Sequence, residues 1–154
     1  MSAIERRLAE LGLSLPQAAA PAANYVPWQK SGRQVIVAGQ LPMQAGKVQV
    51  TGRLGDGVSL ERGVEAARLC GLNILAQVKA ACGGELPDGL RCLRLGGFVA
   101  CTADFFDHPK VVNGASDLMV AAMGDAGRHA RFAVGVASLP LGAAVEVDAL
   151  FEVG

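Results

Sequence analysis

The chain has 154 residues, of which 51% are hydrophobic and 5% aromatic, and its 14 basic side chains balance its 14 acidic ones. This balance, with no segment that gathers Lys and Arg, argues against a nucleic acid partner, because recognition of a phosphate backbone needs clustered positive charge. No apolar run approaches the roughly 20 residues that span a bilayer, and the charged segment 1–17 has no signal-peptide core, so we expect a cytoplasmic protein without a membrane segment.

Residues 1–154 are expected to form one domain, because a chain of this length buries a single core, with residues 1–23 as an N-terminal extension of helix and linker. The apolar periodicity predicts the elements in chain order. They are a helix over Ile4–Leu11, strands at 25–30 and 34–38, a long helix from the Ser59 cap to Gly83, a strand over 90–101, a helix from about 111 to 123, the strand that carries Arg131, and a last strand over 144–153.

This order of elements predicts an α+β fold in which two helices cover one face of a sheet. Ala, Val and Leu dominate both faces of the predicted strands, so the uncovered face would also be apolar. A large exposed apolar face usually marks an interaction surface. We therefore expect an oligomer.

The four cysteines lack CxxC spacing and nearby histidines, which predicts reduced, packed thiols rather than a metal site. They are Cys70, Cys82, Cys92 and Cys101. The two histidines lie far apart, and no metal is expected. His108 falls in the turn-like segment 104–109 and is predicted to be a surface loop residue.

Arg131 is a lone charge on an otherwise apolar strand, and alternation places it on the same face as His129 and Ala133. A guanidinium in such a place needs an anionic partner, which could be a protein carboxylate at an interface or the acid group of a small ligand. His129 could act as an acid or base, although a lone histidine is more often structural.

Four motifs carry a resemblance to a known family. They are Ala130-Arg131-x-x-Val134-x-Val136-x-x-Leu139-Pro140, then Val145-Glu146-Val147, the earlier Ala38-Gly39-Gln40-Leu41-Pro42, and Val112-Asn113. From about Tyr25 onward the chain resembles the Rid family (YjgF-like, reactive intermediate deaminase), as a divergent branch with an extra N-terminal helix. The resemblance implies a chorismate-mutase-like fold, in which a mixed sheet carries two helices on one face and the final strand is inserted between earlier ones. It also implies a homotrimer with a barrel-like core and ligand sites between subunits.

Members of this family hydrolyse enamine or imine intermediates, released by dehydratases acting on serine or threonine, to 2-keto acids and ammonia, and no cofactor is implied. By the resemblance, Arg131 binds the carboxylate of the substrate and Glu146 orients the attacking water. The resemblance also assigns ligand contacts to Tyr25, Ala38, Gly39, Asn113 and Ala133. Alternative roles stay open for Glu146, as a partner of an interface cation, and for Asn113, as a helix cap.

Two positions depart from the family pattern, because Ala38 replaces a serine and Ala133 replaces a cysteine. Both changes remove polar atoms from the implied cleft, which favours an alternative function as a non-catalytic trimer that binds or senses small carboxylates. Endoribonuclease activity, a label that the family also carries, is a further alternative, although the charge balance does not favour it. Chorismate mutase activity would rest on fold analogy alone.

Overall fold

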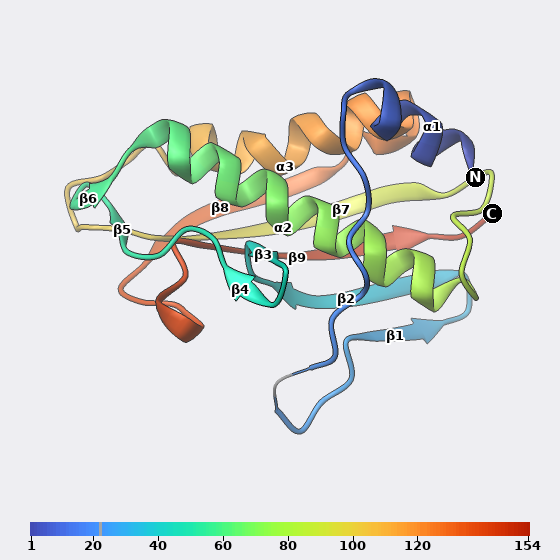
Figure 1. The fold of residues 1–154 in the computed structure, drawn as a ribbon, viewed down its shortest axis with the longest axis horizontal. Coiled ribbons are helices and arrows are strands. Elements are labelled where there is room, and N and C mark those ends of the chain that lie inside the picture. The colour runs from blue at the N-terminus through green and yellow to red at the C-terminus, as the bar shows by residue number, and fades with distance from the viewer. Residues whose placement is uncertain (22) are drawn as a thin grey trace.

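A five-stranded mixed sheet organises the fold, in the strand order β1-β2-β9-β7-β8 (Figure 1). The computed structural model describes residues 1–21 and 23–154; Ala22, in the predicted linker, lies outside the described residues. The elements of the sheet and its helices are α1 (Ala3–Glu10), β1 (Trp28–Ser31), β2 (Gln34–Gln40), α2 (Leu60–Ala81), β7 (Arg91–Ala100), α3 (His108–Met123), β8 (Ala130–Val136) and β9 (Val145–Glu152). Short elements complete the description: β3 (Met43–Gln44), β4 (Lys47–Val48), β5 (Arg53–Leu54), β6 (Gly57–Val58), and the 3₁₀ turns Gly124–Gly127 and Pro140–Gly142.

Strand β9 lies in the middle of the sheet and pairs antiparallel with both β2 and β7. Edge strand β8 pairs with β7 in the parallel direction, which makes the sheet mixed. Sequential strands usually lie side by side, a tendency that would have joined β8 and β9 as a hairpin. The insertion of the last strand between earlier ones, implied by the family resemblance, is confirmed.

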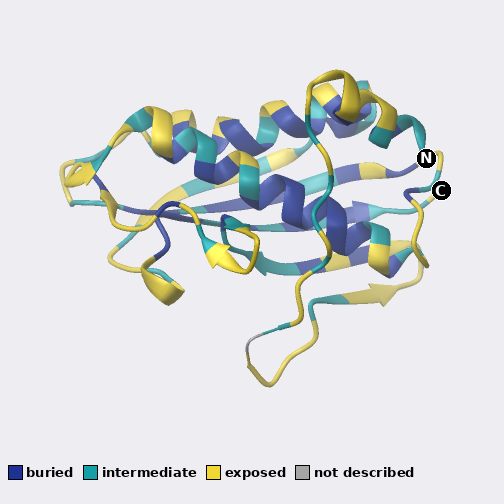
Figure 2. Cartoon of the chain, viewed as in Figure 1, coloured by how far each residue is buried: buried dark blue, intermediate teal, exposed yellow. Residues whose placement is uncertain are grey.

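Helices α2 and α3 pack side by side on one face of the sheet, α2 over β9 and β2 and α3 over β7 and β8. Figure 2 shows buried residues concentrated along α2 and the strands beneath it. Along β9 every second residue is fully buried under the helices, ending with Phe151. The predicted α+β architecture with two helices on one face is therefore confirmed.

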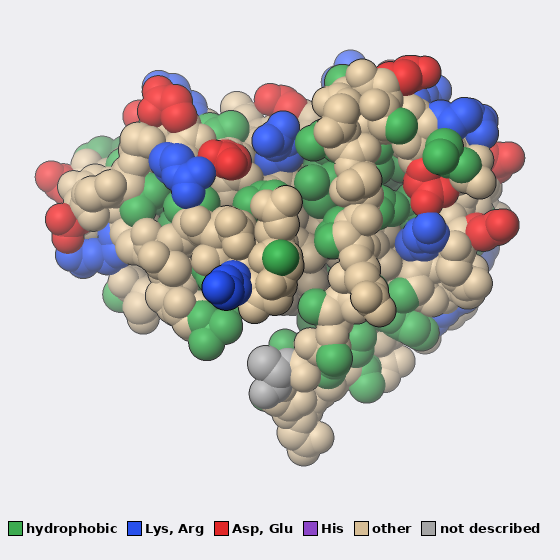
Figure 3. Space-filling view, in the orientation of Figure 1, with side chains coloured by type: hydrophobic (Ala, Val, Ile, Leu, Met, Phe, Trp, Pro, Cys, Tyr) green, Lys and Arg blue, Asp and Glu red, His purple; other side chains and the backbone are tan. Residues whose placement is uncertain are grey.

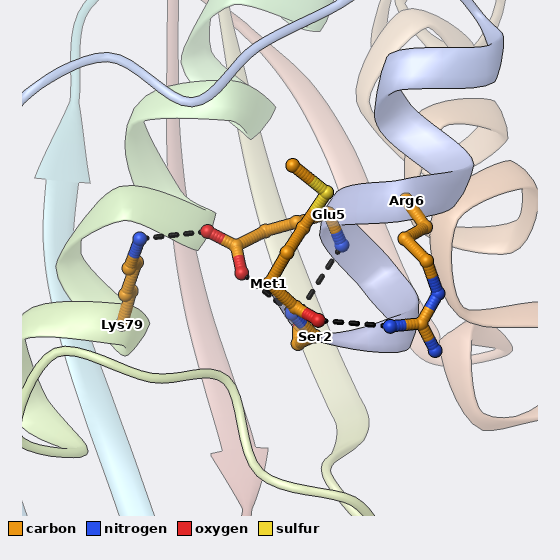
Figure 4. A network of polar contacts seen from close by, with 5 residues as sticks. All are labelled: Met1, Ser2, Glu5, Arg6 and Lys79. Carbon is orange, nitrogen blue, oxygen red and sulfur yellow. Dashed lines mark hydrogen bonds and ion pairs between the residues drawn. The ribbon is translucent and has the colours of Figure 1, made fainter.

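The third helix, α1, is amphipathic and packs against α3, with Ile4 and Leu8 buried. Its first turn is closed by a capping box, in which the Ser2 hydroxyl accepts from the Glu5 N–H and the Glu5 carboxylate accepts from the Ser2 N–H. The same carboxylate accepts a 2.6 Å hydrogen bond from Lys79 of α2 (Figure 4). These contacts attach the N-terminal extension to the helical layer.

Two predicted boundaries differ from the structure by three residues, whereas the others that were predicted differ by at most two. Helix α3 begins at His108, three residues earlier than the sequence pattern indicated, so His108 is a half-buried helical residue and the prediction of a surface loop residue is wrong. Pro109 occupies the second position of α3, where proline is tolerated because the N–H it lacks would have no helical partner. Strand β1 begins at Trp28, after Pro27, so Tyr25 precedes the strand.

The four cysteine thiols are free, as predicted. Cys70 and Cys92 are buried in the core, whereas Cys82 and Cys101 are half-exposed. Burial raises the pKa of the Cys92 thiol to about 12. The buried pair therefore serves packing.

Candidate functional site

Arg131 lies on β8, on the sheet face that α3 covers, opposite Leu95 of β7. Its guanidinium reaches across to α3. Nη1 donates to Asn113 Oδ1 at 2.8 Å and to Ser116 Oγ at 3.1 Å, and Nη2 donates to the Pro109 carbonyl at 3.3 Å. All three acceptors are neutral, so they orient the guanidinium without neutralising it.

No carboxylate within residues 1–21 and 23–154 forms an ion pair with Arg131. Of the five guanidinium N–H donors, Nε and one N–H of Nη2 have no hydrogen-bond partner in the same residues. A half-buried cation with a fixed plane and free donors suits a carboxylate from outside the chain. The described residues of the chain supply no such carboxylate, so both partners predicted from the sequence, a carboxylate at an interface and the acid group of a ligand, would come from outside it.

Ser116 connects Arg131 to His129. His129 Nδ1 lies 2.6 Å from the Gly127 carbonyl oxygen and donates to it, and Nε2 lies 2.8 Å from the Ser116 hydroxyl oxygen. The same hydroxyl oxygen accepts from Arg131 through a lone pair. His129 thus holds Ser116 in place, which is a structural role that supports Arg131.

Asn113 and Ala133 lie beside Arg131, as the predicted grouping requires. Asn113 stands inside α3, beyond its first turn, and the N-cap is Asp107, so the reading of Asn113 as a helix cap is wrong. Ala133 shares the face of Arg131, opposite Gly97 of β7, and packs against the core. Its methyl group brings no polar atom to this part of the site.

Glu146 lies on the opposite face of the sheet. It is paired with Phe98 of β7, whereas its neighbours Val145 and Val147 point under the helices. Glu146 is half-buried, and burial, with the nearby Asp148 carboxylate as a smaller cause, raises the pKa of its carboxyl group. A raised pKa favours a carboxyl group that can exchange a proton near neutral pH.

Gly39 lies directly against Glu146, at a bulge where the pairing of β2 with β9 shifts. A Cβ atom at Gly39 would stand 2.9 Å from the carboxyl carbon of Glu146, closer than a side chain allows. Ala38 precedes it, half-buried, and donates its backbone N–H to the Pro27 carbonyl. Gly39, Ala38 and Glu146 therefore form a second group on the face away from Arg131.

Tyr25 is 50% exposed and lies just before β1, the edge strand farthest from β8. Within one chain, the predicted site residues therefore lie in three separate places. Arg131, Asn113, Ala133 and His129 lie between β8 and α3, Glu146 and Gly39 lie on the uncovered face, and Tyr25 lies near the other edge.

Sequence reasoning missed Ser116 as part of the Arg131 group. The spacing of Ser116 three residues after Asn113 puts both side chains on one helix face, which is the signal that could have found it. The Pro109 carbonyl could not have been found in this way, because the sequence pattern placed the start of the helix after it.

A model of the family described as "YjgF/chorismate_mutase-like, putative endoribonuclease" matches residues 5–153. The chain belongs to this family. The match covers nearly the whole chain, including most of α1, and the fold described above is the chorismate-mutase-like fold of YjgF proteins.

Several relatives match over nearly their whole length. Protein TCP17 of Trypanosoma cruzi is 47% identical over 150 residues, which cover 97% of this chain and 93% of that protein. The solved structure of Atu1372 from Agrobacterium tumefaciens, of unknown function, is 51% identical, with a TM-score of 0.91 over 99% of this chain and 94% of its own. A structure from Shewanella oneidensis, described as a putative endoribonuclease, is 38% identical, with a TM-score of 0.93 over 97% and 99% of the two chains.

A more distant structure, Escherichia coli TdcF with bound serine, is 22% identical, with a TM-score of 0.61 over 91% of this chain and 94% of its own. At this identity the likeness shows the shared fold.

Surface charge, helix composition and side-chain clusters bear on three other kinds of partner, namely nucleic acids, membranes and metal ions. Acidic and basic side chains are interspersed on the face shown in Figure 3. Within residues 1–21 and 23–154, no helix is both long enough and apolar enough to cross a membrane. Among the same residues, no three His, Cys, Asp or Glu side chains come together as a metal site.

Proposed function

We propose that this protein is a hydrolytic deaminase of small enamine or imine intermediates, and that Arg131 binds the carboxylate of the substrate. The observation that carries the proposal is the Arg131 guanidinium, held by three neutral acceptors and with no carboxylate partner among the described residues. A guanidinium oriented in this way can hold a substrate carboxylate through two parallel hydrogen bonds.

Glu146 supplies the second part of the mechanism. Water adds to the imine carbon, the carbon–nitrogen bond breaks, and the products are a 2-keto acid and ammonia. The ionised carboxylate of Glu146 accepts a proton from the attacking water, and its raised pKa makes it a stronger base than an ordinary glutamate. Because imines are already reactive, holding substrate and water together contributes much of the acceleration.

The proposal requires at least two copies of the chain, in the homotrimer that the family resemblance implies. Arg131 and Glu146 lie on opposite faces of one sheet, so Arg131 of one subunit would meet Glu146 and Tyr25 of a neighbour across a cleft. The apolar side chains on the uncovered face support such an assembly. Serine bound to the distantly similar TdcF supports a small amino-acid-like ligand.

The test is hydrolysis of freshly generated 2-iminopropionate or 2-iminobutyrate, followed by loss of the imine. We expect acceleration by the native protein and a loss of about 100-fold in kcat/KM for Arg131→Ala, because the carboxylate loses a charge-assisted pair. Arg128→Ala is the matched control, because Arg128 is a nearby exposed arginine that pairs only with Asp125 among the described residues. Equal rates for the native protein, the Arg131 variant and buffer would refute the deaminase.

Ala38 and Ala133 specifically favour a second candidate, a small-carboxylate binder without turnover. This candidate predicts that 2-oxobutyrate raises the melting temperature in an Arg131-dependent way while no imine is consumed. Cleavage of RNA at a rate that follows Arg131 or His129 variants would instead support the endoribonuclease alternative.

A further inference from the structure

A second pocket, outside the Arg131 group, contains a cysteine and a histidine in contact. It has a volume of about 510 Å³ and is lined by residues that include Arg53, Cys101, His108 and Gly135. Cys101 follows β7 directly, and His108 is the first residue of α3. The segment between them leaves the sheet and returns as a helix, which brings the two side chains together.

The Cys101 sulfur lies 3.4 Å from His108 Nε2, so the thiol can donate a hydrogen bond to the ring nitrogen. The backbone N–H of Cys101 donates to the Val136 carbonyl, which fixes the cysteine against β8. The Phe105 ring packs edge-on against the His108 ring, with centroids 5.5 Å apart. A thiol and a base within hydrogen-bond reach, both held by their surroundings, form the arrangement that activates a sulfur nucleophile.

Gly135 lets this pair lie close against β8. A Cβ atom there would stand 2.5 Å from His108 Nε2 and 2.7 Å from the Cys101 sulfur, closer than either could tolerate. The missing side chain therefore lets both reactive atoms pack against the strand at the wall of the pocket.

Arg53 adds a positive charge to the pocket wall and makes an exposed ion pair with Asp56 at 2.8 Å. Burial raises the pKa of the Cys101 thiol, although the charge of Arg53 opposes this effect. At neutral pH the thiol is mostly protonated and needs a base before it can react. His108 is that base.

We propose that Cys101 and His108 form a nucleophilic thiol site that reacts with small carboxylates bearing an electrophilic carbon. With a 2-oxo acid, the sulfur adds to the carbonyl carbon and a carbon–sulfur bond forms. The thiol proton passes through His108 Nε2 to the former carbonyl oxygen, so the addition is reversible and needs no oxidant. With the probe iodoacetate, the carbon–iodine bond breaks, iodide leaves with its electron pair, and His108 keeps the proton.

The experiment measures the alkylation rate of each cysteine in the full-length native protein at neutral pH, with iodoacetate and iodoacetamide, by mass spectrometry of peptides. Cys82 is the internal control, because it is also half-exposed and burial also raises the pKa of its thiol, but it has no histidine contact among the described residues. We expect Cys101 to react about 100-fold faster than Cys82, the low end of what a positioned base contributes.

Two variants, each with a matched control, test the parts of the site. His108→Gln should remove most of the rate advantage of Cys101, whereas Lys110→Gln, on the same helix but outside the pocket lining, should retain it. Arg53→Gln should remove the preference for iodoacetate over iodoacetamide, and Arg62→Gln should retain it, because Arg62 makes the same kind of i,i+3 ion pair away from the pocket.

Equal alkylation of Cys101 and Cys82 in the native protein would overturn the proposal, and so would an unchanged Cys101 rate in His108→Gln. Gly135→Ala is a second test of the contact between the two side chains. Its methyl group must push His108 and Cys101 apart, so the alkylation of Cys101 should become slower. Alkylation of Cys101 and hydrolysis of the imine are measured separately, so this site and the proposed deaminase site fail or stand separately.

Discussion

The contacts of the Glu5 carboxyl group at the start of α1 lower its pKa strongly. The hydrogen bond from Lys79, with the Ser2 backbone N–H as a smaller cause, lowers the pKa of Glu5 from 4.5 to about 2. A carboxyl group whose pKa is lower in the folded state stabilises the fold above pH 4.5, and this contribution is lost as the pH falls toward 2.

Substitution Glu5→Gln should therefore lower the melting temperature at pH 7 by about 2–4 °C, since partly exposed pairs contribute up to roughly 1 kcal/mol. The difference between the native protein and the variant should shrink between pH 4.5 and pH 2. Thermal unfolding over this pH range measures it, with Glu10→Gln on the same helix as the control. A difference that does not change with pH would contradict the assigned pairing.

Asn113 offers a second test at the scale of one residue, because its Oδ1 accepts from Arg131 at 2.8 Å. Asn113→Asp replaces a neutral acceptor by a carboxylate of the same shape, which should neutralise Arg131 from within the chain. We expect the dissociation constant of a 2-oxo acid, measured by titration calorimetry, to rise about tenfold or more without loss of stability. Ser116→Ala removes an acceptor without adding charge and should cause a smaller rise.

The sequence predicted Arg131 as a site residue because a charge on an apolar strand is conspicuous. It could not predict the partners of Arg131, since these depend on how α3 crosses β8 in the folded chain. Nor could alternation within β9 place Glu146 on the face away from Arg131, because that comparison needs the register of β9 on β7 and of β7 on β8.

Helices α2 and α3 approach closely at Gly114. A Cβ atom there would collide with the backbone of α2 at the Val64 carbonyl, whereas at Gly71 the nearest atom is the flexible end of Leu118, at 2.8 Å. Gly114→Ala should therefore destabilise the protein by about 1–3 kcal/mol, as overpacking does. Gly71→Ala should be nearly neutral, because helix propensity offsets a contact that can relax. Urea unfolding compares the two, and equal losses would contradict the packing described.

At the level of elements, hydrophobic periodicity predicted helix α3 and its end at Met123 correctly. The start of α3 was misplaced because segment 104–109 was interpreted as a turn, whereas Pro109 lies in the first turn of the helix. The first strand was placed too far toward the N-terminus because it was predicted to run through Pro27, whereas β1 begins after this proline.

On the scale of the whole molecule, the sheet face without helices exposes large apolar side chains. Ile36, Phe132 and Val134 are 47%, 36% and 42% exposed there, around the Phe98–Phe132 contact at 5.4 Å. In the same region Asp148 Oδ1 is buried without a hydrogen-bond partner among the described residues, although Oδ2 accepts from Arg94. Burying an oxygen without a hydrogen-bond donor costs free energy in an isolated chain. This cost favours a neighbouring subunit that donates a hydrogen bond to Asp148.

We therefore expect the native protein to sediment as a trimer, and Val134→Lys to sediment as a smaller species, because a charge would be buried in the interface. Leu11→Lys, at an exposed apolar residue beside α1, is the control and should leave the assembly unchanged. Imine hydrolysis should fall with the assembly in Val134→Lys, since the proposed site needs two subunits. A native protein that sediments as a monomer would refute this assembly.

The central position of β9 has a consequence for synthesis on the ribosome. Strands β2 and β7 emerge from the exit tunnel before β9, and until β9 follows they have no shared neighbour to pair with. The nascent chain can form its helices early, but its sheet remains two separate parts with apolar, unpaired edges. Translation that stalls or terminates before residue 145 would release a chain prone to aggregation, so correct folding of the sheet depends on the synthesis of β9.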